Sequence, residues 1–283
     1  MEPLHHQTIS MLALDLDGTL LNSNGIISER TLSCLKAVMK RGVAVTLCSG
    51  RIPAMMRLFV DLLEINGPYV AANGAHVQNR ATGEVLISKP IDPDAVIRLI
   101  EFYEAHGLEF TLMTNSTLYY SAQYSRLFIL EQYNRLSQKL GGPIIKRTIL
   151  KKAGENYAGE PVLKSLTCPS NADLGRELER FLIGDGSFAC SFSESGLFDI
   201  TAFGTDKAYG LQAVADYYGV PMAQVCAIGD FDNDIGMLKN AGLGIAMGNA
   251  SENLLSVADY QTETNDKDGV AAAIERIWNW TRT

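Results

Sequence analysis

Two aspartates, Asp15 and Asp17, stand at the end of the first apolar run of the chain and are followed by Gly18. In an extended strand, residues i and i+2 point to the same face, so the two carboxylates are expected to project together. Two carboxylates that lose hydration side by side need a cation, a proton or hydrogen-bond donors. An isolated Asp-Gly pair is most often only a turn, so a chemical role needs support from elsewhere in the sequence.

That support comes from a second acidic cluster, residues 230–234, which also follows an apolar run directly. Its three carboxylates fit the first ligand positions of an EF-hand, but Ile235 stands where that loop needs glycine and Ala241 where it needs glutamate. A solvated helix N-terminus is the other alternative, because Asp and Asn are favoured there. Taken together, the two clusters predict one shared divalent site of oxygen ligands, which suits Mg²⁺.

Two further segments have residue types that can handle a phosphate group. Ser49 follows an apolar run, and a hydroxyl with free backbone N–H groups at a strand-to-helix turn can hold a phosphate oxygen. Lys207 opens a predicted helix, and near several carboxylates its ammonium can balance the charge of a phosphate and an attacking aspartate. Each signal is weak alone, since Ser-Gly is common and a lone lysine is most often a surface charge.

The elements that would position these residues follow an alternating pattern. Short apolar runs alternate with helical patterns up to a third run at 68–74, a hairpin signal follows at 79–84, and the alternation resumes from about residue 203. Continuous apolar runs, such as residues 43–48, are typical of a parallel sheet covered by helices, whose ligand sites lie at the carboxyl ends of the strands. Ser28 and Pro53 mark two helix starts. We therefore predict an α/β fold with a Rossmann-like, doubly wound parallel sheet.

The intervening residues 85–202 have a different character. Helical patterns occur at 92–106 and 124–140, and strand-like runs, many of them polar at alternate positions, occur at 109–113, 117–121, 162–168, 188–194 and 197–202. Such alternation predicts a sheet with one solvated or ligand-facing side. The simplest division is an α/β core domain of residues 1–84 and 203–283, interrupted by an α+β cap domain of residues 85–202.

Composition excludes several classes of function. The 283 residues are 47% hydrophobic, which is enough for a buried core in each domain. The net charge of −8 opposes the field that binding to a nucleic-acid backbone requires. No apolar run approaches the roughly 18 residues of a membrane span, and the first residues lack the pattern of a secretory leader. The five cysteines are scattered without a Cys-x-x-Cys pair, so we expect a cytoplasmic protein with reduced thiols.

The motifs, in their order along the chain, resemble a known family. DLDGT, CSGR, Lys207 and GDFDND are similar to the four motifs of the haloacid dehalogenase superfamily of phosphotransferases. More narrowly, ANGA, FGTDKAYGL, AIGDFDNDIGML and GIAMGNA resemble its Cof-type phosphatase subfamily, which carries a C2 cap. The resemblance covers most of residues 11–85 and 203–280, and between them it is one of length and α+β character.

The resemblance implies a role for each motif residue. Asp15 would be the nucleophile that forms an aspartyl-phosphate, and Asp17 would be the general acid and base. Ser49 would hydrogen-bond the phosphoryl group, and Lys207 would balance its charge. The implied metal site is made of Asp15, the Asp17 backbone carbonyl, Asp230 and, behind them, Asp234. The implied phosphate and substrate contacts are Ser49, Gly50, Arg51, Asn73, Lys207 and Asn233.

The leading hypothesis is a Mg²⁺-dependent phosphatase that hydrolyses a small phosphorylated metabolite, either a sugar phosphate or a phosphorylated cofactor. Asp17 excludes the transport ATPases of the superfamily, which carry Thr at that position. A phosphomutase stays open because it shares the four motifs, and a non-catalytic phospho-receiver is the alternative from another class.

The cap would choose the substrate and close over it, with hinges near residues 80–88 and 200–205. Its candidate contacts are Tyr119, Tyr120, Tyr124, Arg126 and Lys164.

Overall fold

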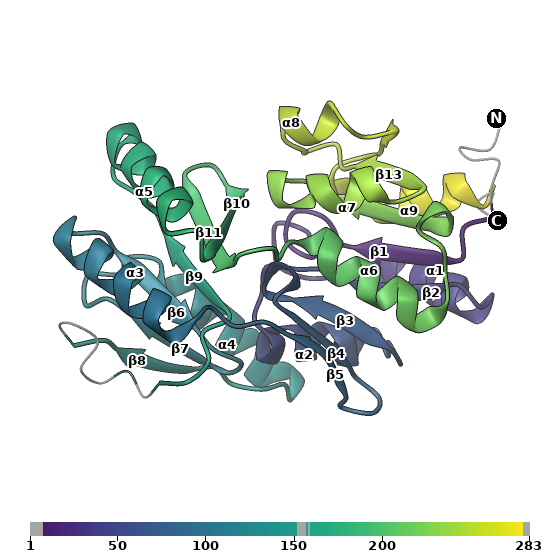
Figure 1. The fold of residues 1–283 in the computed structure, drawn as a ribbon. Coiled ribbons are helices and arrows are strands. Elements are labelled where there is room, and N and C mark those ends of the chain that lie inside the picture. The colour runs from purple at the N-terminus through teal and green to yellow at the C-terminus, as the bar shows by residue number, and fades with distance from the viewer. Residues whose placement is uncertain (1–7, 152–156, 158, 280–283) are drawn as a thin grey trace.

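A five-stranded parallel sheet forms the first layer of the fold. The computed structural model describes residues 8–151, 157 and 159–279. In it the strand order of this sheet is β14-β13-β12-β1-β2, and every neighbouring pair is parallel. The strands are β1 (Met11–Leu14), β2 (Ala44–Leu47), β12 (Val225–Gly229), β13 (Leu243–Ala246) and β14 (Tyr260–Gln261). The predicted α/β fold with a Rossmann-like sheet is therefore confirmed (Figure 1).

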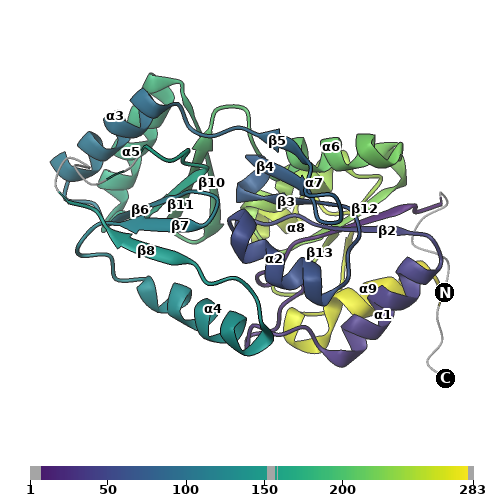
Figure 2. The ribbon, with the colours of Figure 1, turned by 90° about the horizontal axis from the view of Figure 1, so that it is seen from below.

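Helices cover both faces of this sheet (Figures 1 and 2). On one face lie α1 (Glu29–Lys40), α2 (Pro53–Leu62) and α9 (Gly269–Ile277), and on the other α6 (Lys207–Tyr218), α7 (Ile235–Asn240) and α8 (Glu252–Leu255). Successive side chains of β1 alternate between the two layers: Leu12 and Leu14 pack on the α1 side, Met11 and Ala13 on the α6 side. Burial on both faces explains why these strands read as unbroken apolar runs.

The predicted helix starts are confirmed by their caps. The Ser28 hydroxyl accepts a hydrogen bond from the backbone N–H of Thr31 at 3.1 Å, and Pro53 is the first residue of α2. α6 begins at Lys207, because the Asp206 carboxylate accepts the N–H of Tyr209 at 2.7 Å. The cap at Asp206 fixes where the Lys207 side chain leaves the helix.

The third predicted strand of the parallel series belongs to a separate, antiparallel sheet. β3 (Pro68–Ala71) pairs with β4 (His76–Asn79), which pairs with β5 (Val85–Ser88). An isolated bridge between Cys48 and Val70 links this sheet to the end of β2. Because β5 pairs with β4, residues 85–88 lie with the strands before them rather than with the predicted cap. The division into core and cap otherwise stays a prediction, and its outer residues 1–7 and 280–283 lie outside the described residues.

A six-stranded mixed sheet, ordered β10-β11-β9-β6-β7-β8, forms the predicted cap. Its strands are β6 (Phe110–Met113), β7 (Thr117–Tyr120), β8 (Lys146–Ile149), β9 (Lys164–Thr167), β10 (Phe188–Glu194) and β11 (Leu197–Ala202). Helices α3 (Pro93–Ala105) and α5 (Ala172–Asp185) cover one face over a hydrophobic core of their own (Figure 1). The five predicted strands and α3 are confirmed, whereas β8 and α5 were not predicted from the sequence.

The other face of this sheet, which the alternating pattern predicts to be solvated or ligand-facing, looks toward the parallel sheet. Helix α4 (Leu127–Leu140) lies on that side and packs against α2 (Figure 2). Leu130 and Tyr133 of α4 join the same hydrophobic cluster as Phe59 of α2, and the Tyr133 hydroxyl donates to the Ala54 carbonyl at 3.1 Å. In the described part of the chain, no helix is both long and apolar enough to span a membrane.

Candidate active site

The carboxyl ends of three parallel strands bring the predicted chemical residues together. Asp15 follows β1, Ser49 follows β2 and Asp230 follows β12, and β1 lies between the other two strands. The ladder continues into the loops, since the N–H of Asp15 donates to the Ile228 carbonyl at 3.0 Å. Residues more than 200 positions apart in sequence therefore meet at one sheet edge.

A buried lysine joins two of the carboxylates. Nζ of Lys207 donates to Oδ1 of Asp15 and to Oδ1 of Asp234, each at 2.6 Å, and the Lys207 side chain is 1% exposed. Burial raises the pKa of Asp15 well above its usual value, and the Lys207 ammonium opposes that shift. Burial would lower the pKa of Lys207, but the two carboxylates outweigh it and raise that pKa. Positive charge from Lys207 thus offsets part of the cost of burying the Asp15 carboxylate.

Asp15, Asp230 and Asp234 have oxygen atoms that all lie within 4.8 Å of one another. Burial, with the nearby Asp234 charge, raises the pKa of Asp230 to about 7, although the Thr19 hydrogen bond and the Lys207 charge oppose the shift. Three converging carboxylate oxygens fit a hard divalent cation. Asp234 supports the cluster from behind, because its Oδ2 accepts the backbone N–H groups of Asp230 and Phe231 at 3.0 and 3.2 Å.

The Asp230 carboxylate lies against the backbone of Gly18, where the absence of a side chain leaves room for it. Gly18 has a positive φ of 79°, and a Cβ added there would lie 2.2 Å from Oδ2 of Asp230. The Thr19 hydroxyl donates to Oδ1 of the same aspartate at 2.8 Å. The glycine and threonine of the DLDGT motif thus position Asp230, which the sequence reading did not anticipate for either residue.

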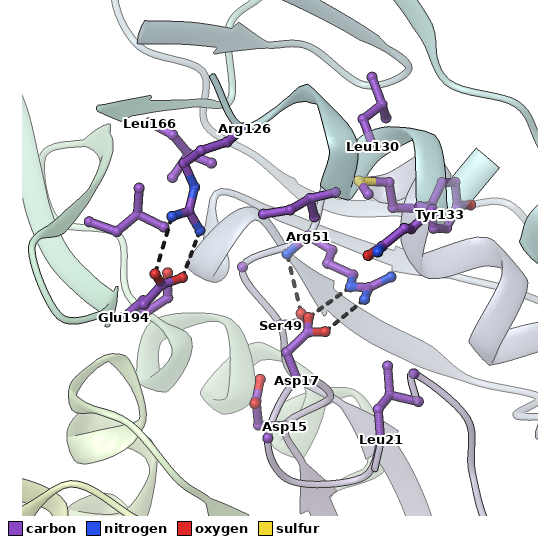
Figure 3. Close-up of a pocket in the computed structure, with 18 of the residues that line it drawn as sticks. Asp15, Asp17, Leu21, Ser49, Arg51, Arg126, Leu130, Tyr133, Leu166 and Glu194 are labelled. Atoms are coloured by element: carbon purple, nitrogen blue, oxygen red, sulfur yellow. Dashed lines mark hydrogen bonds and ion pairs between the residues drawn. The ribbon is translucent and has the colours of Figure 1, made fainter. Parts of the chain in front are cut away.

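The Asp17 carboxylate faces away from the acidic cluster and pairs with Arg51. Nε and Nη2 of Arg51 donate to its two oxygens at 2.8 and 2.7 Å, and the Asp17 side chain is 57% exposed (Figure 3). Desolvation tends to raise the pKa of Asp17, but the charge and hydrogen bonds of Arg51 hold it below its usual value. Phe59 and Tyr133 stack near the guanidinium, at 4.9 and 5.8 Å from their ring centres.

The loop after β2 is held by contacts from two directions. Nζ of Lys164, in β9, donates to the Gly50 carbonyl at 2.9 Å and forms an ion pair with Asp199 of β11. On the other side, the Asn73 backbone N–H donates to the Ser49 carbonyl at 3.1 Å, with Asn73 in the left-handed region at φ 50°. Lys164 and Asp199 were not identified as a pair from the sequence, because their apposition depends on the register of β9 and β11.

These groups border a cavity of about 770 Å³ between the two large sheets. Of the predicted site residues, seven line it: Asp15, Asp17, Ser49, Gly50, Arg51, Asp230 and Asn233. The other three, Asn73, Lys207 and Asp234, lie behind it and hydrogen-bond to lining residues.

The candidate cap contacts divide into two groups. Tyr124, Arg126 and Lys164 line the cavity. Tyr119 instead packs in the hydrophobic core under α3 and α5, and its hydroxyl donates to Glu160 at 3.0 Å. Tyr120 is buried in the core shared with α2.

Comparisons with known proteins agree with this geometry. The family model of haloacid dehalogenase-like hydrolases matches residues 12–274. The chain is 29% identical over 282 residues to the 5-amino-6-(5-phospho-D-ribitylamino)uracil phosphatase YitU of Bacillus subtilis (strain 168), covering 95% of this chain and 97% of YitU. It is 27% identical over 271 residues to the phosphoglycolate phosphatase of Methanopyrus kandleri, covering 95% and 97%. A haloacid dehalogenase-like hydrolase structure from Bacteroides thetaiotaomicron has a TM-score of 0.79 at 29% identity, covering 95% of this chain and all of that one.

Proposed function

Because this chain belongs to the haloacid dehalogenase-like hydrolase family, we propose that it removes phosphate from a small phosphorylated metabolite through an aspartyl-phosphate on Asp15. The observation that carries the proposal is the buried contact of Lys207 with Asp15 beside a second carboxylate, Asp17, on the cavity wall. YitU and the Methanopyrus enzyme are named for different phosphorylated substrates, so they support a small phosphate monoester without choosing one.

The first half-reaction begins at Asp15. Lys207 occupies Oδ1 of Asp15, which leaves Oδ2 to attack phosphorus. An O–P bond forms to Asp15 as the ester P–O bond breaks, and Asp17 gives its proton to the departing oxygen. In the second half-reaction Asp17 takes a proton from water, which attacks phosphorus and restores the Asp15 carboxylate. Covalent catalysis thereby divides one difficult displacement into two steps.

Arg51 would set the protonation of Asp17. Without substrate it holds Asp17 as a carboxylate, while its Nη1 is buried with no hydrogen-bond partner among the described residues. A phosphate dianion is a strong bidentate acceptor for guanidinium, so substrate competes with Asp17 for Arg51. When Arg51 turns its hydrogen bonds from Asp17 to the substrate phosphate, the pKa of Asp17 rises, and the negative charge of the approaching dianion raises it further. Asp17 is then protonated more readily, as release of the leaving group requires.

The acidic cluster fits Mg²⁺, and we propose that Asp15, Asp230 and the Asp17 backbone carbonyl hold it while Asp234 positions Asp230. A bound Mg²⁺ supplies electrostatic stabilisation of the phosphoryl oxygens during transfer. The remaining phosphate contacts would come from the Ser49 hydroxyl, the Gly50 N–H and Asn233, with Asn73 holding Asn233 through a 3.3 Å hydrogen bond.

The test is phosphate release from a panel of phosphorylated sugars and cofactors, with Mg²⁺ or with EDTA. Release should require Mg²⁺ and vanish in Asp15→Asn. The matched control is Asp173→Asn, which changes a 90% exposed carboxylate of the cap helix α5 and should leave release intact. Release that persists in Asp15→Asn would overturn the proposed nucleophile.

A further inference from the structure

The cavity is built differently at its two ends. One end holds Asp15, Asp17 and Asp230, and the other is lined by residues of the cap, among them Arg126 and Glu194 (Figure 3). The walls between them are largely apolar, formed by Phe59, Met113, Leu118, Leu130, Tyr133 and Leu166. A bound phosphate ester would place its phosphate at the acidic end and its leaving group along these walls, toward the cap. The charges at the cap end therefore bear on which leaving groups fit.

One cap cation on the cavity wall is Arg126, at the start of α4. Its Nη1 and Nη2 donate to the two carboxylate oxygens of Glu194, at 3.1 and 2.6 Å. Figure 3 shows this pair across the cavity from Asp15 and Asp17. Glu194, at the end of β10, also lines the cavity, so the positive charge of Arg126 is matched by a negative charge at the same place.

The other cap cation on the wall is Lys164, and it is also matched. Its partner Asp199 is fully buried, and Lys164 is its ion-pair partner as well as the donor to the Gly50 carbonyl. Moving Lys164 toward a ligand would leave the Asp199 charge buried without compensation, which is strongly unfavourable. Among the described cavity-lining residues of the cap, both cations are therefore ion-paired with carboxylates of the cap itself.

We propose that this enzyme acts on phosphate monoesters whose leaving group carries no second negative charge, and that Glu194 enforces this by neutralising Arg126. The inference rests on the proposed function, because it assumes that the substrate phosphate binds at Asp15. A second phosphate or a carboxylate at the cap end would meet the Glu194 carboxylate and find the donors of Arg126 taken. Like charges brought together in this way discriminate against a ligand.

The inference also distinguishes hydrolysis from phosphoryl transfer between positions of a sugar. A phosphomutase that works through a bisphosphate must hold one phosphate at the nucleophile and the other at the cap end. Because Arg126 and Lys164 are already ion-paired, neither is free to bind that second phosphate. The enzyme should accordingly bind a bisphosphate no better than the matching monophosphate.

The experiment measures inhibition of p-nitrophenyl phosphate hydrolysis by glucose 6-phosphate and by glucose 1,6-bisphosphate in Mg²⁺. In the native protein the bisphosphate should inhibit no more strongly than the monophosphate. In Glu194→Gln, which frees Arg126, the inhibition constant of the bisphosphate should fall about tenfold relative to that of the monophosphate. The matched control is Glu131→Gln. It removes the carboxylate that lies 2.7 Å from Arg147, and because neither residue lines the cavity, the ratio should stay unchanged.

Two results would overturn the inference: a native bisphosphate inhibition constant at least tenfold below that of the monophosphate, or an unchanged ratio in Glu194→Gln. If the proposed function itself is wrong, the assay gives a different result. In that case p-nitrophenyl phosphate would not be hydrolysed, or its hydrolysis would survive in Asp15→Asn.

Discussion

Replacing Lys207 by methionine should destabilise the protein strongly, and by an amount that depends on pH. The side chain is 1% exposed, and its ammonium lies 2.6 Å from both Asp15 and Asp234. Methionine keeps much of the aliphatic volume but leaves two neighbouring carboxylates buried without a counter-charge. Breaking a buried ion pair from one side costs about 3–5 kcal/mol. For a chain of this size that corresponds to a fall in Tm of about 6 to 20 °C.

The pH dependence follows from the carboxylates that remain. Burial already raises the pKa of Asp15 even with Lys207 present, and loss of the ammonium raises it further. The folded variant then takes up a proton more readily than the unfolded chain, so its stability falls as pH rises. The Tm difference between native protein and Lys207→Met should be larger at pH 8 than at pH 5, and added Mg²⁺ should recover part of it.

Differential scanning calorimetry in EDTA at both pH values checks this. The control is Lys36→Met, which removes a 46% exposed ammonium 3.9 Å from Glu64 and should cost less than about 1 kcal/mol. A Tm change in Lys207→Met as small as that of the control would refute the argument that Lys207 compensates buried charge.

Three further changes test other parts of the site and fold. Arg51→Met removes the cation that lowers the pKa of Asp17. Because Asp17 must be protonated to act as the acid of the first half-reaction, the basic limb of the kcat/KM profile should move to higher pH, and a limb that stays in place contradicts this. Gly18→Ala adds a Cβ 2.2 Å from Oδ2 of Asp230, so the Mg²⁺ concentration for half-maximal phosphate release should rise at least about tenfold, and unchanged Mg²⁺ dependence would count against it. Burial lowers the pKa of His76, so protons bind the unfolded chain first, and the free energy of unfolding should fall as pH drops below about 6.5. His76→Gln should flatten that dependence in urea titrations from pH 7 to 5, and equal slopes would exclude the histidine as its source.

The core of the site was predictable because it depends on local pattern and strand direction alone. Asp15, Ser49 and Asp230 each follow an apolar run directly, and parallel strands put their carboxyl ends at one edge. Lys207 was predictable as a helix start, since Asp206 provides the cap. Distance along the chain did not matter for these residues, because β1 pairs with β12 whatever lies between them.

Contacts that depend on the register of antiparallel strands could not be predicted from the sequence. Lys164 meets Asp199 only because β9 and β11 pair with Ser165 opposite Ile200, and a shift by one residue would turn the side chains to the other face. Helix α5 was also not predicted, but for a different reason. Its signals are present in the sequence, with Asn171 accepting the N–H of Leu174 at the start and Gly186 in the left-handed conformation at the end.

The central place of β1 has a consequence for synthesis of the protein. One of its neighbours, β2, follows soon after it, but the other, β12, lies about 214 positions later in the chain. At roughly 5–20 residues per second, a ribosome needs about 10 to 40 s to make the intervening chain. Throughout that time the edge of a wholly apolar strand has no partner, which makes the nascent chain prone to aggregation. Messages truncated before β12 should therefore yield insoluble fragments, and full-length yield in cells should depend on chaperones that hold the first part of the chain.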